Sequence, residues 1–358
     1  MGDGTPAAPH PVGPGGCRRV PGLRPVRTTE GLRMLTYSGS AAYCYSDSLA
    51  MVLGRRAPSP GVIETLTGSP FGVQLAAGTL PLFDPCGWDP EAGLDAAVAL
   101  LGLRCERSDG GTPDEALDRL RAACARGPVL AGPLDIGLLP YQCHTFQPGT
   151  SAQPDEDVAD HYLVVLEADT QRVLLHDPHG HPYATLPTAA FLDSWRGSAV
   201  TYIDTPFVLR TGFVREREVT VEDALRRSLP DAVRWLAGRT DLPVPPGTLG
   251  GAAAVEALAG QVRTGLAPGI RTLLATFGVP VGARRLADAA ACLDMLGLNA
   301  AATAADGQAR VLGSLQHPLV TGDDGALEAG LHRLAPGYEL LREALAGETA
   351  AVPGGGAR

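Results

Sequence analysis

Residues 160–180, DHYLVVLEADTQRVLLHDPHG, contain two apolar runs separated by the polar sequence EADTQ. Two such runs around a short polar turn are typical of an antiparallel β-hairpin. A turn centred on Asp169, or between Asp169 and Thr170, places His161 opposite Asp177 to within one residue. Opposed Cβ atoms in such a ladder lie about 5 Å apart, so a carboxylate can reach one imidazole nitrogen. The hairpin therefore predicts a sheet in this part of the chain and a His161–Asp177 pair, although the two residues could also simply begin one strand and end the next.

Other apolar runs flank this hairpin and alternate with helical segments. GPVLAGPL at 127–134 and SAVTYID at 198–204 read as strands. The pattern predicts an α+β fold in which helices cover one side of an antiparallel sheet. FDPCGWDPEAGLDAAVALLG at 83–102 adds a helix that begins at Asp89 and Pro90.

The sequence changes in character near residue 215, after which Ala/Leu-rich helical patterns dominate. Thr220 is suited to cap the first of these helices, and Pro230 is expected to restart it. Later helices are predicted at 250–266, 269–278, 282–297 and 326–347. The expected organisation is a Pro/Gly-rich tail over 1–28, an α+β domain over 29–214, an all-helical domain over 215–350 and a second tail over 351–358.

The composition is that of an acidic globular protein, with a net charge of −10, 45% hydrophobic and 19% charged residues. A nucleic-acid partner is therefore not expected. All 29 basic residues are arginine, which excludes a lysine Schiff base and the lysine-containing phosphate loop. No secretory signal or apolar span is visible, so we expect a cytoplasmic protein without a membrane partner, whose seven cysteines are free thiols.

One cysteine begins a helical pattern in SGSAAYCYSDSLAMVLG, residues 38–54. Ser40 can cap this helix, and Gly54 can end it. Cys44 would lie in the first turn, where the helix dipole and a nearby histidine lower a thiol pKa. With His161 as base and Asp177 as its orienting partner, Cys44 completes a possible nucleophilic triad. The alternative is that Cys44 is a small buried residue.

These motifs resemble those of a known enzyme class. A cysteine that opens a helix, a later HYLVV strand and an Asp-Pro that ends the next strand resemble the papain-like C39 peptidases. GPVLAGPLDIGLLPY before DHYLVVLEAD resembles the butirosin biosynthesis protein H-like family. That family combines a papain-like domain with a helical domain, and the resemblance covers residues 37 to 210.

The resemblance implies an acyltransferase. Its acyl group would come from the phosphopantetheine thioester of an acyl carrier protein, pass through Cys44 and reach a small-molecule amine, with no bound cofactor. Asp135 and Tyr141 would line the cleft. The glutamine that C39 peptidases carry before the cysteine is absent, so the oxyanion would be held by the Cys44 N–H and a hydroxyl of Tyr37 or Ser38.

Several alternatives remain open. Hydrolysis, cyclisation or peptide cleavage would use the same triad, and a catalytically silent binding protein would use none of it. The cluster His176, Asp177, His179 and His181 contains metal-ligand types, although no metal is expected.

Other residues compete for a functional role. Cys86 is a rival nucleophile, whereas Cys143 and the adjacent His144 should point to opposite faces. The acidic run SAQPDEDVAD at 151–160 is a solvated loop, a lid or a site for a cationic amine. Two arginine pairs, Arg226/Arg227 and Arg284/Arg285, could dock an acidic carrier protein.

Overall fold

The computed structural model describes Met1 and residues 43–142 and 160–351. Its contacts divide the chain into Met1–Met34 and Leu35–Arg358, so all described residues except Met1 belong to the second unit. The tails predicted at 1–28 and 351–358 fall outside the described residues, apart from Met1 and Ala351. No helix among the described residues is both long and apolar enough to cross a membrane.

The fold is α+β, as predicted, and its centre is a six-stranded antiparallel sheet. The predicted hairpin forms the strands β5 and β6, and GPVLAGPL contributes most of β4. In spatial order the strands are β3 (Leu103–Ser108), β8 (Leu209–Arg215), β4 (Val129–Asp135), β5 (Asp160–Ala168), β6 (Arg172–Asp177) and β7 (His181–Pro187).

The run SAVTYID does not form a strand. Residues 198–204 lie in turns, and the N–H of Val200 donates to the carbonyl of Gly197 at 3.0 Å. The strand that pairs with β4 on the side away from β5 is β8, which begins at Leu209. An apolar run that follows a glycine can therefore form turns. Here another segment, β8, pairs with β4 in its place.

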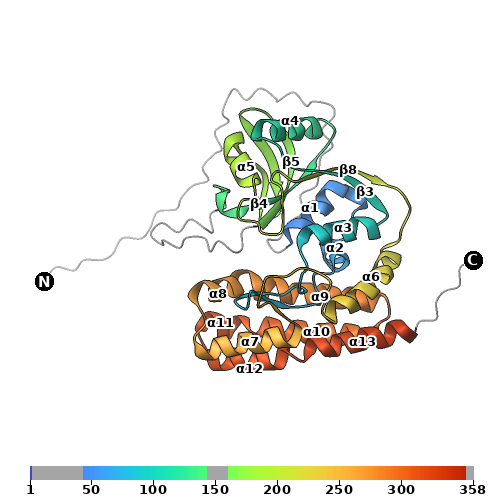
Figure 1. The fold of residues 1–358 in the computed structure, drawn as a ribbon, viewed down its shortest axis with the longest axis vertical. Helices are drawn as coiled ribbons and strands as arrows, with labels where there is room; N and C mark the ends of the chain where they lie inside the picture. Colours follow the sequence, from blue (N-terminus) through green and yellow to red (C-terminus); the bar gives the residue numbers. More distant parts are fainter. Residues whose placement is uncertain (2–42, 143–159, 352–358) are drawn as a thin grey trace, which may run out of the picture. The chain divides into compact units, whose positions relative to one another are not determined.

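Helices cover both faces of the sheet, so the prediction of helices on one side is wrong (Figure 1). Successive strand residues point to opposite faces. Leu130 and Tyr162 belong to the core with α1 (Cys44–Leu53) and α3 (Pro90–Leu100). Their neighbours on β4 and β5 pack instead on α4 (Pro113–Cys124) and α5 (Thr188–Trp195). β4 and β5 are buried on both sides, which explains why their apolar runs are nearly continuous.

Local capping explains where several helices begin. Asp89 caps α3 by accepting from the N–H of Ala92 at 2.8 Å, as predicted. Thr220 caps α6 (Val221–Leu236) by accepting from the N–H of Asp223 at 3.0 Å, also as predicted. Pro230 lies inside α6 without interrupting it, so the predicted restart is wrong. Its exposed position lets water satisfy the carbonyl that loses an N–H partner.

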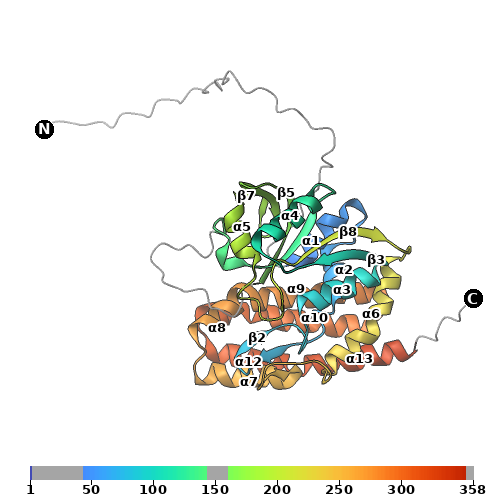
Figure 2. The same ribbon diagram turned by 45° about the horizontal axis from the view of Figure 1, so that its top comes forward.

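The region from Gly251 onward is helical, as predicted, and lies beside the N-terminal part in both views (Figures 1 and 2). α2 (Pro60–Thr67) packs on α9 of this region. The prediction omitted α10, whose sequence is rich in alanine and glycine, and α11, which has only six residues. The helices are α7 (Gly251–Thr264), α8 (Pro268–Leu273), α9 (Val279–Met295), α10 (Asn299–Ser314), α11 (Gln316–Thr321), α12 (Asp324–Leu334) and α13 (Gly337–Ala351); a π-helical turn (Leu274–Gly278) joins α8 to α9.

A small sheet connects the N-terminal part of the chain to the helical region. β1 (Gln74–Ala76) pairs with β2 (Leu80–Leu82) and with β9 (Leu249–Gly250). These strands of two or three residues are too short to give a sequence pattern, and the prediction missed them. The change from sheet to helices falls between β8 and α6. Because Leu35–Arg358 form one compact unit, the division into two domains near residue 215 stays a prediction.

Candidate functional site

Cys44 is the first residue of α1. The helix ends at Gly54, whose φ of 66° suits glycine. The predicted cap, Ser40, lies outside the described residues. Tyr43 precedes the helix and offers no side-chain cap, so among the described residues the first-turn N–H groups have no capping side chain. The positive end of α1 therefore begins at the cysteine.

The side chains of His161 and Asp177 are in contact at the open end of the hairpin, away from its turn. His161 Nε2 lies 2.9 Å from Asp177 Oδ1, and both side chains are fully buried. The ionised carboxylate can only accept, so Nε2 carries the proton. The contact predicted from the hairpin is present.

The register that produces this contact differs from the predicted one. The turn is centred on Thr170 and Gln171, because the Asp169 N–H donates to the Arg172 carbonyl at 3.0 Å. A bulge then lies between Val165 and Glu167.

As a result the strands are offset by one to two residues. Val164 pairs with His176, where the predicted turn would place residue 174 or 175. Continuing this register puts Asp177 on the diagonal of His161 rather than directly across. A diagonal neighbour on the same face is still within reach of a long side chain.

Asp177 accepts three further hydrogen bonds from residues that the structure describes. The Tyr141 hydroxyl and the Gln142 amide donate to Oδ2 at 2.9 and 2.7 Å, and the His179 N–H donates to Oδ1 at 2.8 Å. Burial alone would raise the pKa of Asp177, but the charge and hydrogen bond of His161, with the His179 N–H, hold it well below its usual range. Asp177 is therefore ionised and can orient the imidazole.

Tyr141 was predicted to line the cleft, which stays a prediction, and its hydroxyl donates to Asp177. Gln142 was missed, although it directly follows Tyr141 in the sequence. Asp135 does not reach Asp177: its carboxylate caps a short 3₁₀ turn by accepting from the Gly137 N–H at 3.0 Å. That turn leads toward Tyr141. Tyr37 and Ser38, the predicted oxyanion residues, lie outside the described residues.

The second nitrogen of His161 lacks a hydrogen-bond partner within the part of the chain that the structure describes. Nδ1 is buried and makes no hydrogen bond among the described residues. In the neutral form of the ring, with the proton on Nε2, Nδ1 presents a lone pair and can act as a base. A buried acceptor without a partner is unfavourable unless a ligand or reaction uses it.

The Cys44 sulfur lies near the backbone of Tyr162, the residue that follows His161. The Tyr162 N–H is close enough to lower the pKa of the thiol, which places the sulfur near the peptide unit that joins His161 to Tyr162. The hydrogen bonds of the described residues include none between the sulfur and Nδ1. Catalytic hydrogen bonds are often long in free enzymes and shorten when substrate binds.

The environment of Cys44 differs from the predicted one. Burial and the negative charge of Asp160 raise the pKa of the Cys44 thiol well above its ordinary value, and the Tyr162 N–H opposes them only in part. The resting residue is therefore a thiol rather than a thiolate. A reaction at this sulfur requires a base to remove the proton as attack proceeds.

Asp160 begins β5 and was part of the predicted acidic run. Its Oδ2 accepts from the Tyr202 hydroxyl at 2.9 Å, and burial raises its pKa. The other acids of that run lie outside the described residues. Asp160 is therefore a charged neighbour of Cys44 that sequence reasoning treated only as part of a loop.

The substitution Asp160→Asn is expected to speed alkylation of Cys44 by iodoacetamide near neutral pH by about tenfold, because it removes a charge that opposes thiolate formation. The rate constant should be measured between pH 6 and 9. Asp118→Asn, at an exposed site on α4, is the control and should leave the rate unchanged. An unchanged rate in Asp160→Asn would show that this carboxylate does not influence the thiol.

Three groups of the site could also hold a metal ion. Ligand atoms of His161, Asp177 and His179 lie within 4.8 Å of one another. The other two members of the predicted histidine cluster are engaged elsewhere: His176 Nδ1 accepts from the Tyr183 N–H at 3.1 Å, and the His181 ring packs on Tyr141. A metal here would compete with the hydrogen bond between His161 and Asp177.

Other described cysteines resemble Cys44 in having a raised thiol pKa. Burial raises the pKa of Cys86, and Asp84 adds to the effect. Burial likewise raises the pKa of Cys124 to about 12. Cys143 and His144 lie outside the described residues.

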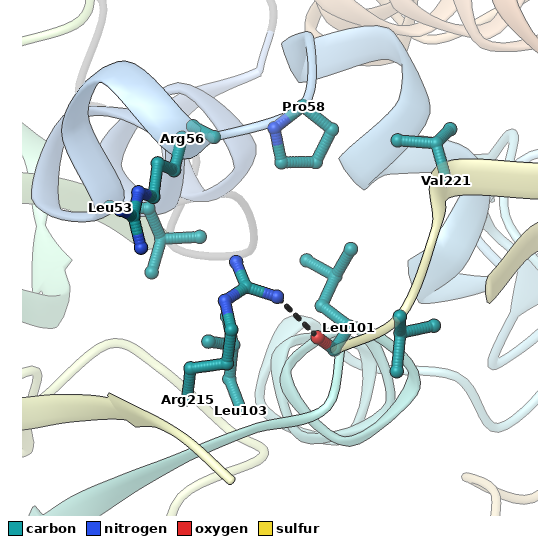
Figure 3. Close-up of a pocket in the computed structure, with 9 residues that line it drawn as sticks. Leu53, Arg56, Pro58, Leu101, Leu103, Arg215 and Val221 are labelled. Carbon is teal, nitrogen blue, oxygen red and sulfur yellow. Dashed lines mark hydrogen bonds between the residues drawn. The ribbon is translucent and has the colours of Figure 1, made fainter. Parts of the chain in front are cut away.

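A pocket lies at the other end of α1 (Figure 3). α1 separates Leu53 from Cys44 by nine residue steps, about 14 Å along the helix axis. Arg215 closes one wall by donating to the carbonyl of Leu101 at 3.4 Å. The lining residues are Leu53, Arg56, Ala57, Pro58, Leu101, Leu103, Arg215, Val219 and Val221. This pocket is separate from the site at Cys44.

The arginine pair at 284 and 285 is not the docking surface that the sequence suggested. The Arg285 side chain is 4% exposed and pairs with buried carboxylates, and Arg284 packs over the ring of Tyr43. Arg226 and Arg227, on α6, are exposed. A burial pattern cannot be read from two adjacent arginines, because only the tertiary contact decides which one faces inward.

Comparison with known proteins gives one match in the helical region and one similar protein. Residues 245–346 match the family model of the YobF C-terminal domain. The chain is also 30% identical over 172 residues to a Bacillus subtilis (strain 168) protein named "Uncharacterized protein YobF". That similarity covers 47% of this chain and 53% of the relative, so the chain spans about half the length of the curated relative it matches. Residues 245–346 are thus similar to the YobF C-terminal domain, and Cys44, His161 and Asp177 lie outside that match.

Proposed function

We propose that the protein is a cysteine-dependent acyltransferase in which Cys44 is the nucleophile, His161 the base and Asp177 its orienting partner. The observation that carries this proposal is the buried Nδ1 of His161, which has no hydrogen-bond partner in residues 43–142 and 160–351. Its ring is held through Nε2 by an ionised carboxylate, and the adjoining peptide N–H lies near the cysteine sulfur. A base, an orienter and a thiol in this relation are the parts that nucleophilic catalysis requires.

In the first step the Cys44 sulfur attacks the carbonyl carbon of an acyl thioester while its proton moves to His161 Nδ1. The resulting oxyanion faces the first-turn N–H groups of α1, including that of Cys44. Collapse breaks the carbon–sulfur bond to phosphopantetheine, whose thiolate takes the proton from Nδ1. The product of this half-reaction is an acyl-Cys44 thioester.

In the second step an amine attacks the acyl group and gives its proton to His161 Nδ1. The bond to the Cys44 sulfur breaks, and the sulfur recovers the proton. Asp160, which lies close enough to act on the thiol electrostatically, is suited to hold a cationic amine near the acyl group. No cofactor is needed for either step.

The choice of an acyl carrier protein as donor, and of a natural-product pathway, follows from the resemblance of residues 37 to 210 to the butirosin biosynthesis protein H-like and C39 peptidase-like proteins. Under this proposal the N-terminal part is papain-like. The five described cysteines are free thiols, which is in keeping with a cytoplasmic location. Hydrolysis, cyclisation and peptide cleavage would use the same residues and differ in the group that attacks acyl-Cys44.

The test is a product analysis with an acyl-pantetheine thioester and a panel of primary amines. The proposal predicts an amide that exceeds the free acid, and no amide from Cys44→Ala. Free acid alone would point to a hydrolase, and a lactam or macrocycle to a cyclase. An activity that persists in Cys44→Ala and is abolished by a chelator would favour the metal arrangement of His161, Asp177 and His179 instead.

A further inference from the structure

α9 of the helical region contacts both sequence neighbours of Cys44. The Tyr43 hydroxyl donates to Asp288 Oδ2 at 2.9 Å. The Arg284 guanidinium lies 4.0 Å from the centre of the Tyr43 ring, a distance suited to a cation–π contact. The residue immediately before the cysteine is thus held by two side chains of α9.

Tyr45, the residue after the cysteine, is held by a buried group of side chains. Arg285 Nη2 donates to the Tyr45 hydroxyl at 2.9 Å, and its Nε donates to Glu64 Oε1 at 2.8 Å. Its Nη1 lies 3.2 Å from Asp84 Oδ2. All three guanidinium nitrogens therefore have partners, although the side chain has almost no contact with solvent.

Glu64 extends this network to the next residue of α1. The Ser46 hydroxyl donates to Glu64 Oε2 at 2.6 Å, and the Tyr45 hydroxyl donates to Oε1 of the same carboxylate. Tyr43, Tyr45 and Ser46, which bracket Cys44, are consequently all tied to groups that α9 holds.

One glycine makes this approach possible. A Cβ atom on Gly61, in α2, would come within 2.7 Å of the Asp288 carboxylate. A side chain at residue 61 would force the Asp288 carboxylate to move from its present position. The contact between α2 and α9 is therefore built for close packing.

We propose that Arg285 and Asp288 of α9 are positioning residues for the nucleophile, so that the YobF-like helical region fixes the placement of Cys44 relative to His161. This inference rests on the proposed function. A buried ion network contributes little net stability compared with well-packed apolar residues. The network contacts the residues on both sides of the cysteine, and such contacts are what a positioning role requires.

The main variants are Tyr43→Phe, which removes the hydrogen bond to Asp288, and Asp288→Ala, which also removes the ion pair with Arg284 at 3.6 Å. Both leave the buried contacts of Arg285 in place. Each is expected to lower the kcat of acyl transfer about tenfold with little change in KM, because Cys44 is misplaced while substrate contacts remain. The pH profile of Cys44 alkylation should shift toward that of an ordinary cysteine, which a loss of stability alone would not produce.

Arg285→Met and Arg285→Lys extend the test to the buried network. Lysine keeps the charge without the three-way fork, so it should recover part of the kcat that methionine loses. If Arg285→Met does not fold, the Tyr43 and Asp288 variants decide the question. The control is Asp324→Asn, which weakens the ion pair between Arg271 and Asp324, at 2.5 Å between α8 and α12, and should leave both readouts unchanged.

The two proposals fail in distinguishable ways. If the wild-type protein transfers no acyl group, the proposed function fails, and the alkylation profile still reports on the positioning of Cys44. If Tyr43→Phe and Asp288→Ala fold and match the wild type in both kcat and alkylation profile, the positioning role is overturned.

Discussion

Replacing His161 with alanine is expected to slow acylation of Cys44 by about 10²- to 10⁴-fold, the range that a well-placed general base contributes. The reason is the protonation state of the sulfur. Burial and Asp160 raise the pKa of Cys44, so the thiol does not ionise by itself at neutral pH. Without Nδ1 no described group in the same position can accept its proton.

The rate should be measured as single-turnover release of the pantetheine thiol. His332→Ala is the matched control, because His332 is an exposed histidine whose carboxylate partners, Glu256 and Glu328, are on helices of the C-terminal region. It should acylate at the wild-type rate. A His161→Ala variant that acylates within a factor of about three of the wild type would remove histidine from the mechanism.

Replacing Asp177 with alanine is expected to lower the free energy of unfolding by about 3–5 kcal/mol, as removal of one partner from a buried pair does. Four donors lose their acceptor at once, including His161 Nε2 and the side chains of Tyr141 and Gln142. Urea unfolding monitored by circular dichroism measures this loss. Asp177→Asn keeps the shape and should be less destabilising, while acylation falls with both variants because the imidazole is no longer oriented.

The pH dependence of this stability has a defined sign. The folded pKa of Asp177 is lower than its unfolded value, so its contribution is present above the ordinary carboxyl pKa of about 4. It is lost as the pH falls below that value toward the folded pKa. The difference between wild type and Asp177→Ala should therefore shrink in acid. Asp169→Ala, in the exposed hairpin turn, should cause a much smaller loss, and an equal loss in both variants would contradict the role of the Asp177 network.

Much of the site could be predicted from local sequence patterns. The presence of Cys44 in the first turn of a helix follows from the spacing of the apolar residues, although the N-cap position is Tyr43 and not the predicted Ser40. The hairpin follows from two β-rich runs around a polar turn. The contact between His161 and Asp177 was predictable despite an incorrect register. Asp and His side chains are long enough to meet across a diagonal.

Other features depend on tertiary structure. A bulge such as that between Val165 and Glu167 adds a residue without a local signature. The burial of Arg285 depends on the packing of α9 against α2, and these elements are separated by more than 200 residues. The raised pKa of Cys44 likewise reflects burial and the approach of Asp160, whereas the sequence showed only the helix terminus.

The central claim is that Cys44 carries the acyl group, and intact-mass analysis after mixing the protein with an acyl carrier protein thioester tests it most directly. The proposal predicts a mass increase equal to one acyl group, mapped to the peptide that contains Cys44, absent from Cys44→Ala and removed by an amine acceptor. An acyl adduct on another cysteine such as Cys86, or normal turnover by Cys44→Ala, would contradict it.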